Sequence, residues 1–210
     1  MQGPILHILQ DPRLGLDIEA SLVVSRIEQY LQLLLKWNQK INLTAEKDPA
    51  EILKKHVFDS LQYVRAIEPG FRMMDIGSGA GFPGILLKII FPQLQLVLLE
   101  SQRKRCSFLE TVVRDLEMEQ VKVFNARAED IPGDQAGPFD VVVFRAVSGV
   151  QQCLNLSTKF LPSGGMVVLK KSPGENQLGS HPEFSLQKEV AITSYHGVVS
   201  SLLVFEKCFT

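Results

Sequence analysis

The sequence predicts an α/β fold, in which a mostly parallel sheet with an antiparallel C-terminal strand pair follows a helical extension at the N-terminus. Two observations predict it. From residue 72 onward, short apolar runs alternate with helical segments, which is typical of βαβ units. Before residue 70, apolar residues recur at helical spacing. We therefore expect two parts, a helical extension over 1–69 and a sheet domain over 70–210.

The composition excludes several classes of protein. The 22 basic and 23 acidic residues nearly balance, which argues against a protein that coats nucleic acid by charge alone. The 3 cysteines lie far apart without metal-ligand spacing, so we expect reduced thiols and no metal site. The chain has neither an apolar run of about 18 residues nor a basic start typical of export signals. We expect a cytoplasmic protein that binds no membrane.

The N-terminal part is expected to contain two helices. Apolar residues between Asp17 and Lys40 share one helical face. The turn that follows holds Asn42 and Thr44, and their residue types favour a turn-forming role. A second helix is expected to start at 48–49, where an aspartate and a proline suit the N-cap and the first position. His56 lies beside its apolar stripe, and both a structural role and a contact with a polyanion remain open.

A glycine-rich loop follows the first predicted strand, 72–76. Gly79-x-Gly81-x-x-Gly84 matches the dinucleotide-binding pattern, in which glycines permit positive φ and close approach of a ligand. Two residues point elsewhere. Asp75 places a carboxylate before the first glycine, and Pro83 has no N–H to donate to a pyrophosphate. The order D-x-G-x-G-x-G resembles the first motif of S-adenosylmethionine-dependent methyltransferases, whose cofactor carries a positive sulfonium.

A second acid is expected at the same edge of the sheet. The second predicted strand, 94–99, is followed directly by Glu100. A right-handed crossover places this strand beside the first, so its carboxylate can accept both hydroxyls of a ribose. The next predicted helix begins with the cations Arg103, Lys104 and Arg105, which oppose the helix dipole. Both a phosphate contact and a solvated face remain open for them, and Lys54 and Lys55 could extend such a surface.

The later strands add further side chains to this edge. The loop after the third strand, 121–124, contains Ala128 and Glu129 and is expected to run along the adenine of a nucleoside. The fourth strand, 141–144, delivers Arg145, and the fifth, 166–169, delivers Lys170 and Lys171. An arginine that leaves an apolar run needs a carboxylate, a ligand or a phosphate. A polar loop over 173–185 and an antiparallel pair within 188–209 complete the prediction.

Several motifs in order resemble one family, the 16S ribosomal RNA guanine-N7 methyltransferases, long called glucose-inhibited division protein B. They run from Trp37 to Lys170 and read W-N-x-x-x-N-L-T, H-x-x-D-S, D-I-G-S-G-A-G-F-P-G, K-R-x-x-F-L, Ala128-Glu129 and Arg145-Ala146. The chain departs from the family pattern after Lys170, where Lys171 replaces a glycine.

The resemblance implies a Rossmann-like S-adenosylmethionine-dependent methyltransferase fold and an enzyme that methylates N7 of a guanine in 16S rRNA of the small ribosomal subunit. It also implies a cytoplasmic monomer without a DNA or membrane partner. The family's cofactor contacts carry over to Gly77, Phe82, Ala128, Glu129 and Arg145. The glycine motif adds Asp75, Gly79 and Gly81, and the fold argument adds Glu100.

The implied chemistry suits the residues. Guanine N7 has an in-plane lone pair and no proton to lose, so we expect alignment and exclusion of water rather than a general base. Arg145, Lys170 and His56 are the candidates for positioning the guanine or its phosphates. Two alternatives remain: a nicotinamide-dependent oxidoreductase that uses the same loop, and a non-catalytic RNA-binding protein.

Overall fold

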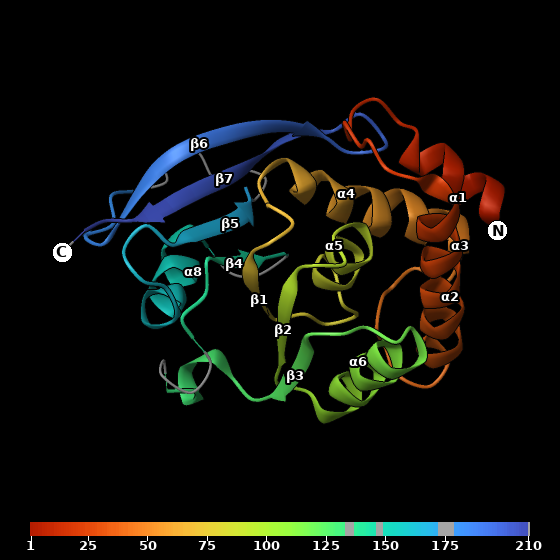
Figure 1. Cartoon of the computed structure of the whole chain (residues 1–210), viewed down its shortest axis with the longest axis horizontal. Helices are drawn as coiled ribbons and strands as arrows, with labels where there is room; N and C mark the ends of the chain where they lie inside the picture. Colours follow the sequence, from red (N-terminus) through yellow and green to blue (C-terminus); the bar gives the residue numbers. More distant parts are fainter. Residues whose placement is uncertain (133–136, 146–148, 172–178, 210) are drawn as a thin grey trace.

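The centre of the computed structural model is a mixed sheet, and the structure describes residues 1–132, 137–145, 149–171 and 179–209 (Figure 1). Seven described strands pair in the order β3-β2-β1-β4-β5-β7-β6. They are β1 (Arg72–Ile76), β2 (Gln95–Glu100), β3 (Val121–Asn125), β4 (Val141–Phe144), β5 (Met166–Lys170), β6 (Phe184–Thr193) and β7 (Val199–Lys207). β1 to β5 pair in parallel, while β7 is antiparallel to both β5 and β6. The predicted sheet is confirmed.

The strand order reverses at β1, which lies between β2 and β4. Ile76 at the end of β1 pairs with Leu99 on one side and with Phe144 on the other. The carboxyl ends of these strands therefore meet at one edge. In open α/β sheets this reversal point is where a ligand crevice forms.

Helices cover both faces of the sheet (Figure 1). The described α-helices are α1 (Gln2–Leu9), α2 (Ala20–Asn38), α3 (Pro49–Ile52), α4 (Phe58–Leu61), α5 (Gly84–Ile90), α6 (Arg103–Asp115) and α8 (Val150–Ser157). Shorter helical turns are η1 (Leu53–Val57), η2 (Gln62–Arg65), η3 (Ala128–Asp130) and η4 (Thr158–Phe160). No helix in the described part of the chain is long and apolar enough to span a membrane.

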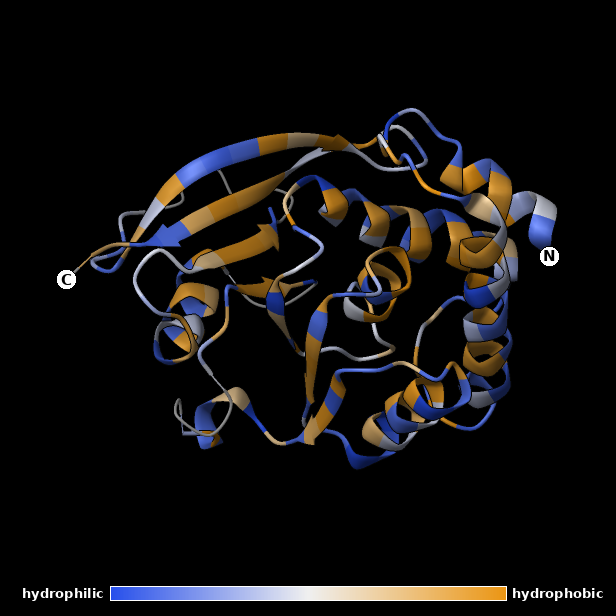
Figure 2. Ribbon diagram, viewed as in Figure 1, coloured by the Kyte–Doolittle hydropathy of each residue, from blue (hydrophilic) through white to orange (hydrophobic). Residues whose placement is uncertain are grey.

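Two hydrophobic cores form because successive residues of a strand point to opposite faces. Met73 packs into the core that contains α2, α5 and α6, whereas its neighbour Met74 packs into the core that contains α8. Figure 2 shows hydrophobic residues along the central strands and mixed hydropathy on α2 and α6. The N-terminal helices thus share a core with one face of the sheet, and the boundary near residue 70 stays a prediction.

The second N-terminal helix differs from the regular helix that periodicity predicted. Asp48 caps it as expected, accepting a hydrogen bond from the Ala50 N–H over 3.0 Å. A π-helical turn at Leu53–Val57 then interrupts it and contains His56. Such wide turns are frequent at functional sites, and periodicity does not reveal a single extra residue in a turn.

The two ends of the chain also differ from expectation. Helix α1 was not predicted, although its residue Ile5 is fully buried. β6 begins at Phe184 rather than near Lys188, with a register shift between Leu186 and Lys188. The first part of the predicted polar loop, 173–178, lies outside the described residues.

Candidate active site

The glycine loop between β1 and α5 adopts the predicted left-handed backbone. Gly77, Gly79 and Gly81 have φ of 75°, 57° and 91°. The Gly77 N–H donates to Leu99 O over 2.8 Å, and the Ser78 N–H donates to the same oxygen over 3.1 Å. The loop is therefore fixed against the end of β2. A Cβ on Gly79 would meet only Gly77 O, at 3.8 Å, so the space beside this residue is open.

Asp75 lies beneath the loop rather than at its surface. Its side chain is 1% exposed, and Oδ2 accepts the Gly84 N–H over 3.0 Å. Oδ1 is buried without a hydrogen-bond partner among the described residues. Burial raises the pKa of Asp75 to about 7, although the Gly84 N–H and Arg145 act in the opposite direction. The geometry makes Asp75 a support of the loop, and its contact with a cofactor stays a prediction.

Gly84 permits a close approach between α5 and the sheet. A Cβ there would lie 2.7 Å from Asp75 Oδ2 and 2.8 Å from Leu98 Cδ2. The helix can start directly over β1 only because this residue lacks a side chain.

Glu100 meets the loop across the strand boundary, as the crossover argument predicted. Its Oε2 accepts the Gly79 N–H over 3.0 Å, and Oε1 accepts the Gln102 N–H over 2.8 Å. The carboxylate is 5% exposed. Each carboxylate oxygen can accept two hydrogen bonds, so the described residues leave one acceptor position on each oxygen for the hydroxyls of a ligand.

Arg145 and His56 meet at the same edge from opposite parts of the chain. Arg145 Nη2 donates to His56 Nδ1 over 2.6 Å. Arg145 Nη1 also donates to His56 O over 3.3 Å and to Ser60 Oγ over 3.4 Å. Because an arginine can only donate, Nδ1 must be the acceptor and the ring carries its proton on Nε2.

Glu46 and Thr44 hold the other side of the imidazole. His56 Nε2 lies 2.7 Å from Glu46 Oε2 and 2.8 Å from Thr44 Oγ1, and Thr44 donates its hydroxyl to Glu46 over 2.7 Å. Hydrogen bonds from Thr44 and His56 lower the pKa of Glu46 to about 2. Burial, and then the Arg145 charge, lower the pKa of His56. At neutral pH the ring is therefore a neutral link between an anion and a cation.

Phe82 supports both partners of this pair. The His56 ring stacks on it with centroids 5.1 Å apart and an interplanar angle of 19°. The Arg145 guanidinium carbon lies 4.9 Å from its centroid. Phe82 is 6% exposed and packs edge-on against Tyr30, whose hydroxyl donates to Ala80 O over 2.6 Å. The loop, the N-terminal helices and the end of β4 are thus joined around one ring.

Lys170 reaches the same helical segment from β5. Its Nζ lies 2.5 Å from Asp59 Oδ2. The other oxygen, Oδ1, is buried without a hydrogen-bond partner in the described part of the chain. His56, Asp59 and Ser60 of the H-x-x-D-S motif therefore contact the two basic side chains that leave β4 and β5.

The remaining predicted cofactor residues, Ala128 and Glu129, lie in the turn after β3. Ala128 is buried and Glu129 is exposed in the turn after β3. The Glu129 carbonyl accepts a hydrogen bond from Lys159 over 3.0 Å. Ala146 lies outside the described residues. The cofactor contacts of Ala128 and Glu129 stay predictions.

The basic cluster that the sequence suggested is partly neutralised. Lys54 pairs with Glu51 at 3.3 Å, and Lys55 pairs with Glu46 at 3.3 Å. Arg105 lies 3.8 Å from the Glu100 carboxylate. Arg103 and Lys104 are exposed at the start of α6.

Sequence reasoning missed Glu46 and undervalued Thr44. Both lie in a polar turn, where an acid and a threonine look like ordinary solvated residues. The motif W-N-x-x-x-N-L-T ends at Thr44 and could have indicated this contact. The residue types of Asn42 and Thr44 favoured a turn-forming role instead. Asn38 of the same motif shapes this turn, because its Oδ1 accepts the N–H groups of Leu43 and Thr44 over 2.9 and 3.1 Å.

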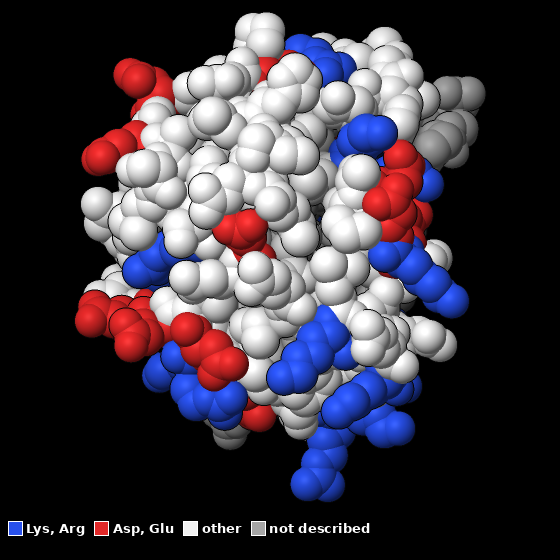
Figure 3. All heavy atoms as spheres, turned by 90° about the vertical axis from the view of Figure 1, so that its right-hand side faces the viewer, with Lys and Arg blue, Asp and Glu red and all other residues white. Residues whose placement is uncertain are grey.

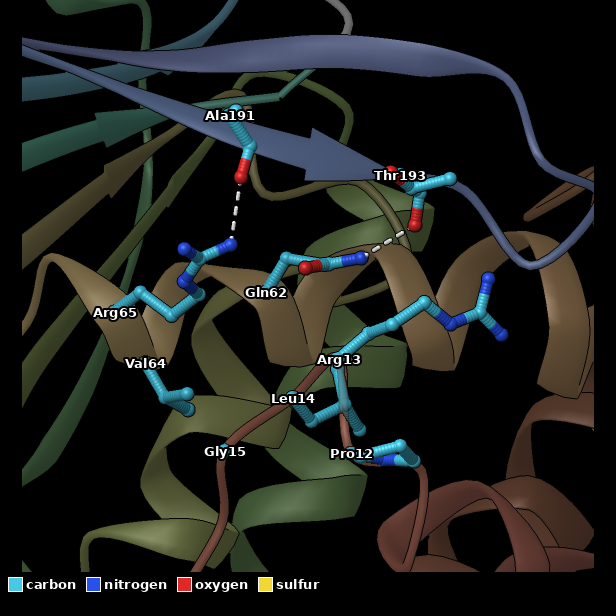
Figure 4. A pocket seen from close by; sticks show the side chains of 9 residues that line it. All are labelled: Pro12, Arg13, Leu14, Gly15, Gln62, Val64, Arg65, Ala191 and Thr193. Carbon is cyan, nitrogen blue, oxygen red and sulfur yellow. Dashed lines mark hydrogen bonds between the residues drawn. The ribbon is translucent and has the colours of Figure 1, made fainter.

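A separate cavity of about 450 Å³ lies between the α1–α2 connection, η2 and β6 (Figure 4). Arg65 donates to Ala191 O over 2.6 Å, and Gln62 donates to Thr193 O over 2.7 Å. Arg13, at its rim, donates to Ser194 O over 3.0 Å. These side chains satisfy carbonyls of an edge strand, so we assign this cavity a structural role.

Comparison with known proteins identifies the family. The family model of rRNA small subunit methyltransferase G, GidB, matches residues 23–202. The chain belongs to this family. It is 42% identical over 164 residues to the ribosomal RNA small subunit methyltransferase G of Streptococcus pyogenes serotype M4, covering 75% of this chain and 69% of that protein. The serotype M12 protein is 42% identical over 158 residues, covering 72% and 66%. The chain spans about two thirds of the length of these relatives.

Solved structures show the same fold as this member of the GidB family. Cofactor-bound Rv0187 from MTB matches with a TM-score of 0.60 and 16% identity, covering 89% of this chain and 91% of that one. A variant of MtNAS in complex with S-adenosylmethionine matches with a TM-score of 0.58 and 15% identity, covering 100% and 84%. The Rossmann-like methyltransferase fold that the resemblance implied is confirmed.

Proposed function

We propose that this chain transfers a methyl group from S-adenosylmethionine to N7 of a guanine in 16S rRNA, acting as a cytoplasmic monomer on the small ribosomal subunit or its RNA. The observation that carries the proposal is the contact between Arg145 and His56 over Phe82 of the glycine loop. Lys170 pairs with Asp59, three residues after His56, and Glu100 accepts the Gly79 N–H at the same edge of the sheet. Family membership supplies the reaction class.

The residues at this edge fit the cofactor. The left-handed glycines leave open space at Gly79, and Glu100 retains acceptor positions that suit the ribose hydroxyls. Phe82 adds an aromatic wall beside the loop. When bound, S-adenosylmethionine supplies a methyl group that is already activated by the adjacent sulfonium.

The chain's own residues position the guanine rather than move a proton. Guanine N7 needs no base, and a donor on N7 would block its lone pair, so O6 or a phosphate is the expected partner. Three of the five Arg145 N–H groups point to His56 and Ser60, which leaves two that have no partner among the described residues and could reach the substrate. The neutral His56 holds the guanidinium over the ring of Phe82, with the guanidinium carbon 4.9 Å from the ring centroid.

The test is methyl transfer from radiolabelled S-adenosylmethionine to small subunits from a strain that lacks this gene, followed by mass spectrometry of the rRNA nucleosides. We expect one 7-methylguanosine per subunit, and loss of turnover in Arg145→Ala. Label on another base, or binding of NAD in place of S-adenosylmethionine, would contradict the proposal. Light scattering tests the monomer, and a matched DNA strand tests the preference for RNA.

A further inference from the structure

A groove between α2 and α6 is a second basic surface, distinct from the cluster at the start of α6. One part has a volume of about 350 Å³ and is lined by Leu33, Lys36, Trp37, Lys40, Thr111, Arg114 and Asp115. A neighbouring part, also about 350 Å³, shares Leu33, Lys36 and Asp115 and adds Gln29, Gln32 and Leu116. The two parts therefore form one continuous groove.

The charge of this groove differs from that of the chain. Its lining holds three cations and one acid, a net charge of +2, whereas the whole chain carries −1. The acid, Asp115, is already bonded to Arg114 at 2.9 Å. Lys36 and Lys40 are exposed and form no ion pair with any described residue. Figure 3 views the molecule from the side of α2. Lysine and arginine side chains gather in the lower part of the face that it shows.

An aromatic side chain forms part of the wall. Trp37 is half-buried, packs edge-on against Phe108 with centroids 5.9 Å apart, and also lines the groove. The contact with Phe108 fixes the indole in place. A fixed aromatic face beside free cations is the combination that binds single-stranded RNA, because bases stack on the ring and phosphates pair with the lysines.

Two segments of the chain lead from the groove to the candidate active site. Trp37 lies in the last turn of α2, directly before the connection that leads to Glu46, which holds His56. Arg105 of α6 donates to Asn42 O in this connection over 3.4 Å. The groove residue Thr111 lies eight positions after Arg103, about 12 Å along α6 at 1.5 Å per residue. A strand that presents a base at the active site can therefore extend along the groove.

We propose that the α2–α6 groove binds a single-stranded RNA segment next to the target guanine, with Lys36 and Lys40 on its phosphates and a base against Trp37. The proposal rests on the proposed function for the identity of the RNA. It assigns substrate binding to a surface away from the cofactor edge, where Lys36 and Lys40 have no acidic partner among the described residues to displace.

Trp37 makes the test direct, because it is the only tryptophan in the sequence. Its emission is followed while a guanine-free single-stranded RNA oligonucleotide is added, so that the reading is independent of methyl transfer. We expect saturable quenching. Lys36→Ala/Lys40→Ala should weaken binding several-fold and lower the log–log salt slope by about 1.4, since each phosphate contact of a single strand contributes about 0.7.

The matched control is Lys122→Ala/Lys188→Ala, which removes two exposed lysines from β3 and β6. It should leave affinity and slope unchanged. Anisotropy of a labelled oligonucleotide measures RNA binding independently of Trp37. Binding that leaves Trp37 emission unchanged would overturn the proposal. Equal losses of RNA affinity in the two double variants, or no RNA binding at all, would also overturn it. Equal quenching by polyglutamate would assign the groove to an acidic protein instead. Methyl transfer by the unaltered chain, measured separately, tests the proposed function.

Discussion

His56 accepts a hydrogen bond from Arg145 on Nδ1 over 2.6 Å, and its Nε2 faces Glu46 at 2.7 Å. The ring thus connects the Glu46 carboxylate, in a surface turn, to the Arg145 guanidinium at the end of β4 through two hydrogen bonds. This arrangement requires one tautomer, with the proton on Nε2, because a proton on Nδ1 would point at the arginine donor. Glu46 favours that tautomer because it accepts the Nε2 proton.

The first prediction concerns Glu46→Gln. The amide can donate to Nε2, which allows the other tautomer and releases Arg145 from the ring. We expect turnover to fall by about 5- to 30-fold, the equivalent of about 1 to 2 kcal/mol for one buried hydrogen bond. Nitrogen-15 NMR of the imidazole should show the Nε2–H form in the unaltered chain and a mixture in the variant.

Glu51→Gln is the control for this variant, because Glu51 pairs with Lys54 and Lys55 on the same segment without touching His56. It should preserve turnover and the tautomer. An unchanged imidazole spectrum in Glu46→Gln would remove Glu46 from the role of positioning residue.

The sequence predicted the sheet edge well because strand topology determines it. Asp75, Glu100 and Arg145 end adjacent parallel strands, and the carboxyl ends of such strands meet wherever the order reverses. The left-handed glycines follow from the same geometry. These predictions needed only periodicity and the handedness of the crossover.

The polar contacts could not be predicted in the same way. Whether an acid is solvated, paired or buried depends on side chains brought together by tertiary packing. Asp75 is buried beneath the loop, where its contact with a ligand stays a prediction, and Lys55, which could have extended a basic surface, pairs with Glu46. The π-helical turn that carries His56 depends on one additional residue in a turn, which a helical pattern does not register.

The second prediction compares Gly79→Ala with Gly84→Ala. At Gly79 a Cβ would meet no described atom closer than Gly77 O at 3.8 Å, so the variant should fold with a cost of about 1 to 2 kcal/mol for the left-handed backbone. Its affinity for S-adenosylmethionine should fall because the methyl group enters the ligand space. Calorimetry measures the affinity, and urea denaturation measures the stability.

Gly84→Ala should show the opposite pattern. Its Cβ would lie 2.7 Å from Asp75 Oδ2, so overpacking should lower the free energy of unfolding by about 1 to 3 kcal/mol. Affinity among the molecules that remain folded should change less than in Gly79→Ala. Equal losses of affinity in both variants would show that the loop is only a structural turn.

The third prediction concerns pH and Asp75. Its folded pKa of about 7 lies above the ordinary aspartate value of 3.8, so the folded state binds more protons than the unfolded state between these values. Its contribution to stability is therefore fully present below about pH 4 and is lost as the pH rises through 7. Asp75→Asn cannot ionise, so its stability relative to the unaltered chain should increase over this window. Urea denaturation from pH 4.5 to 8 measures the difference, and a difference that does not vary with pH would contradict the assigned burial effect.

The last prediction concerns Glu100, whose two oxygens accept the N–H groups of Gly79 and Gln102 and retain one acceptor position each. Glu100→Ala removes both the support of the loop and the partners expected for the ribose hydroxyls. Affinity for S-adenosylmethionine should fall by about 1 to 3 kcal/mol, a factor of about 5 to 150. Glu100→Gln keeps one carbonyl acceptor and should lose less. Glu110→Gln, an exposed position on α6, should change nothing. Calorimetric titration orders the three variants, and an affinity in Glu100→Ala equal to that of the unaltered chain would exclude Glu100 from the cofactor site.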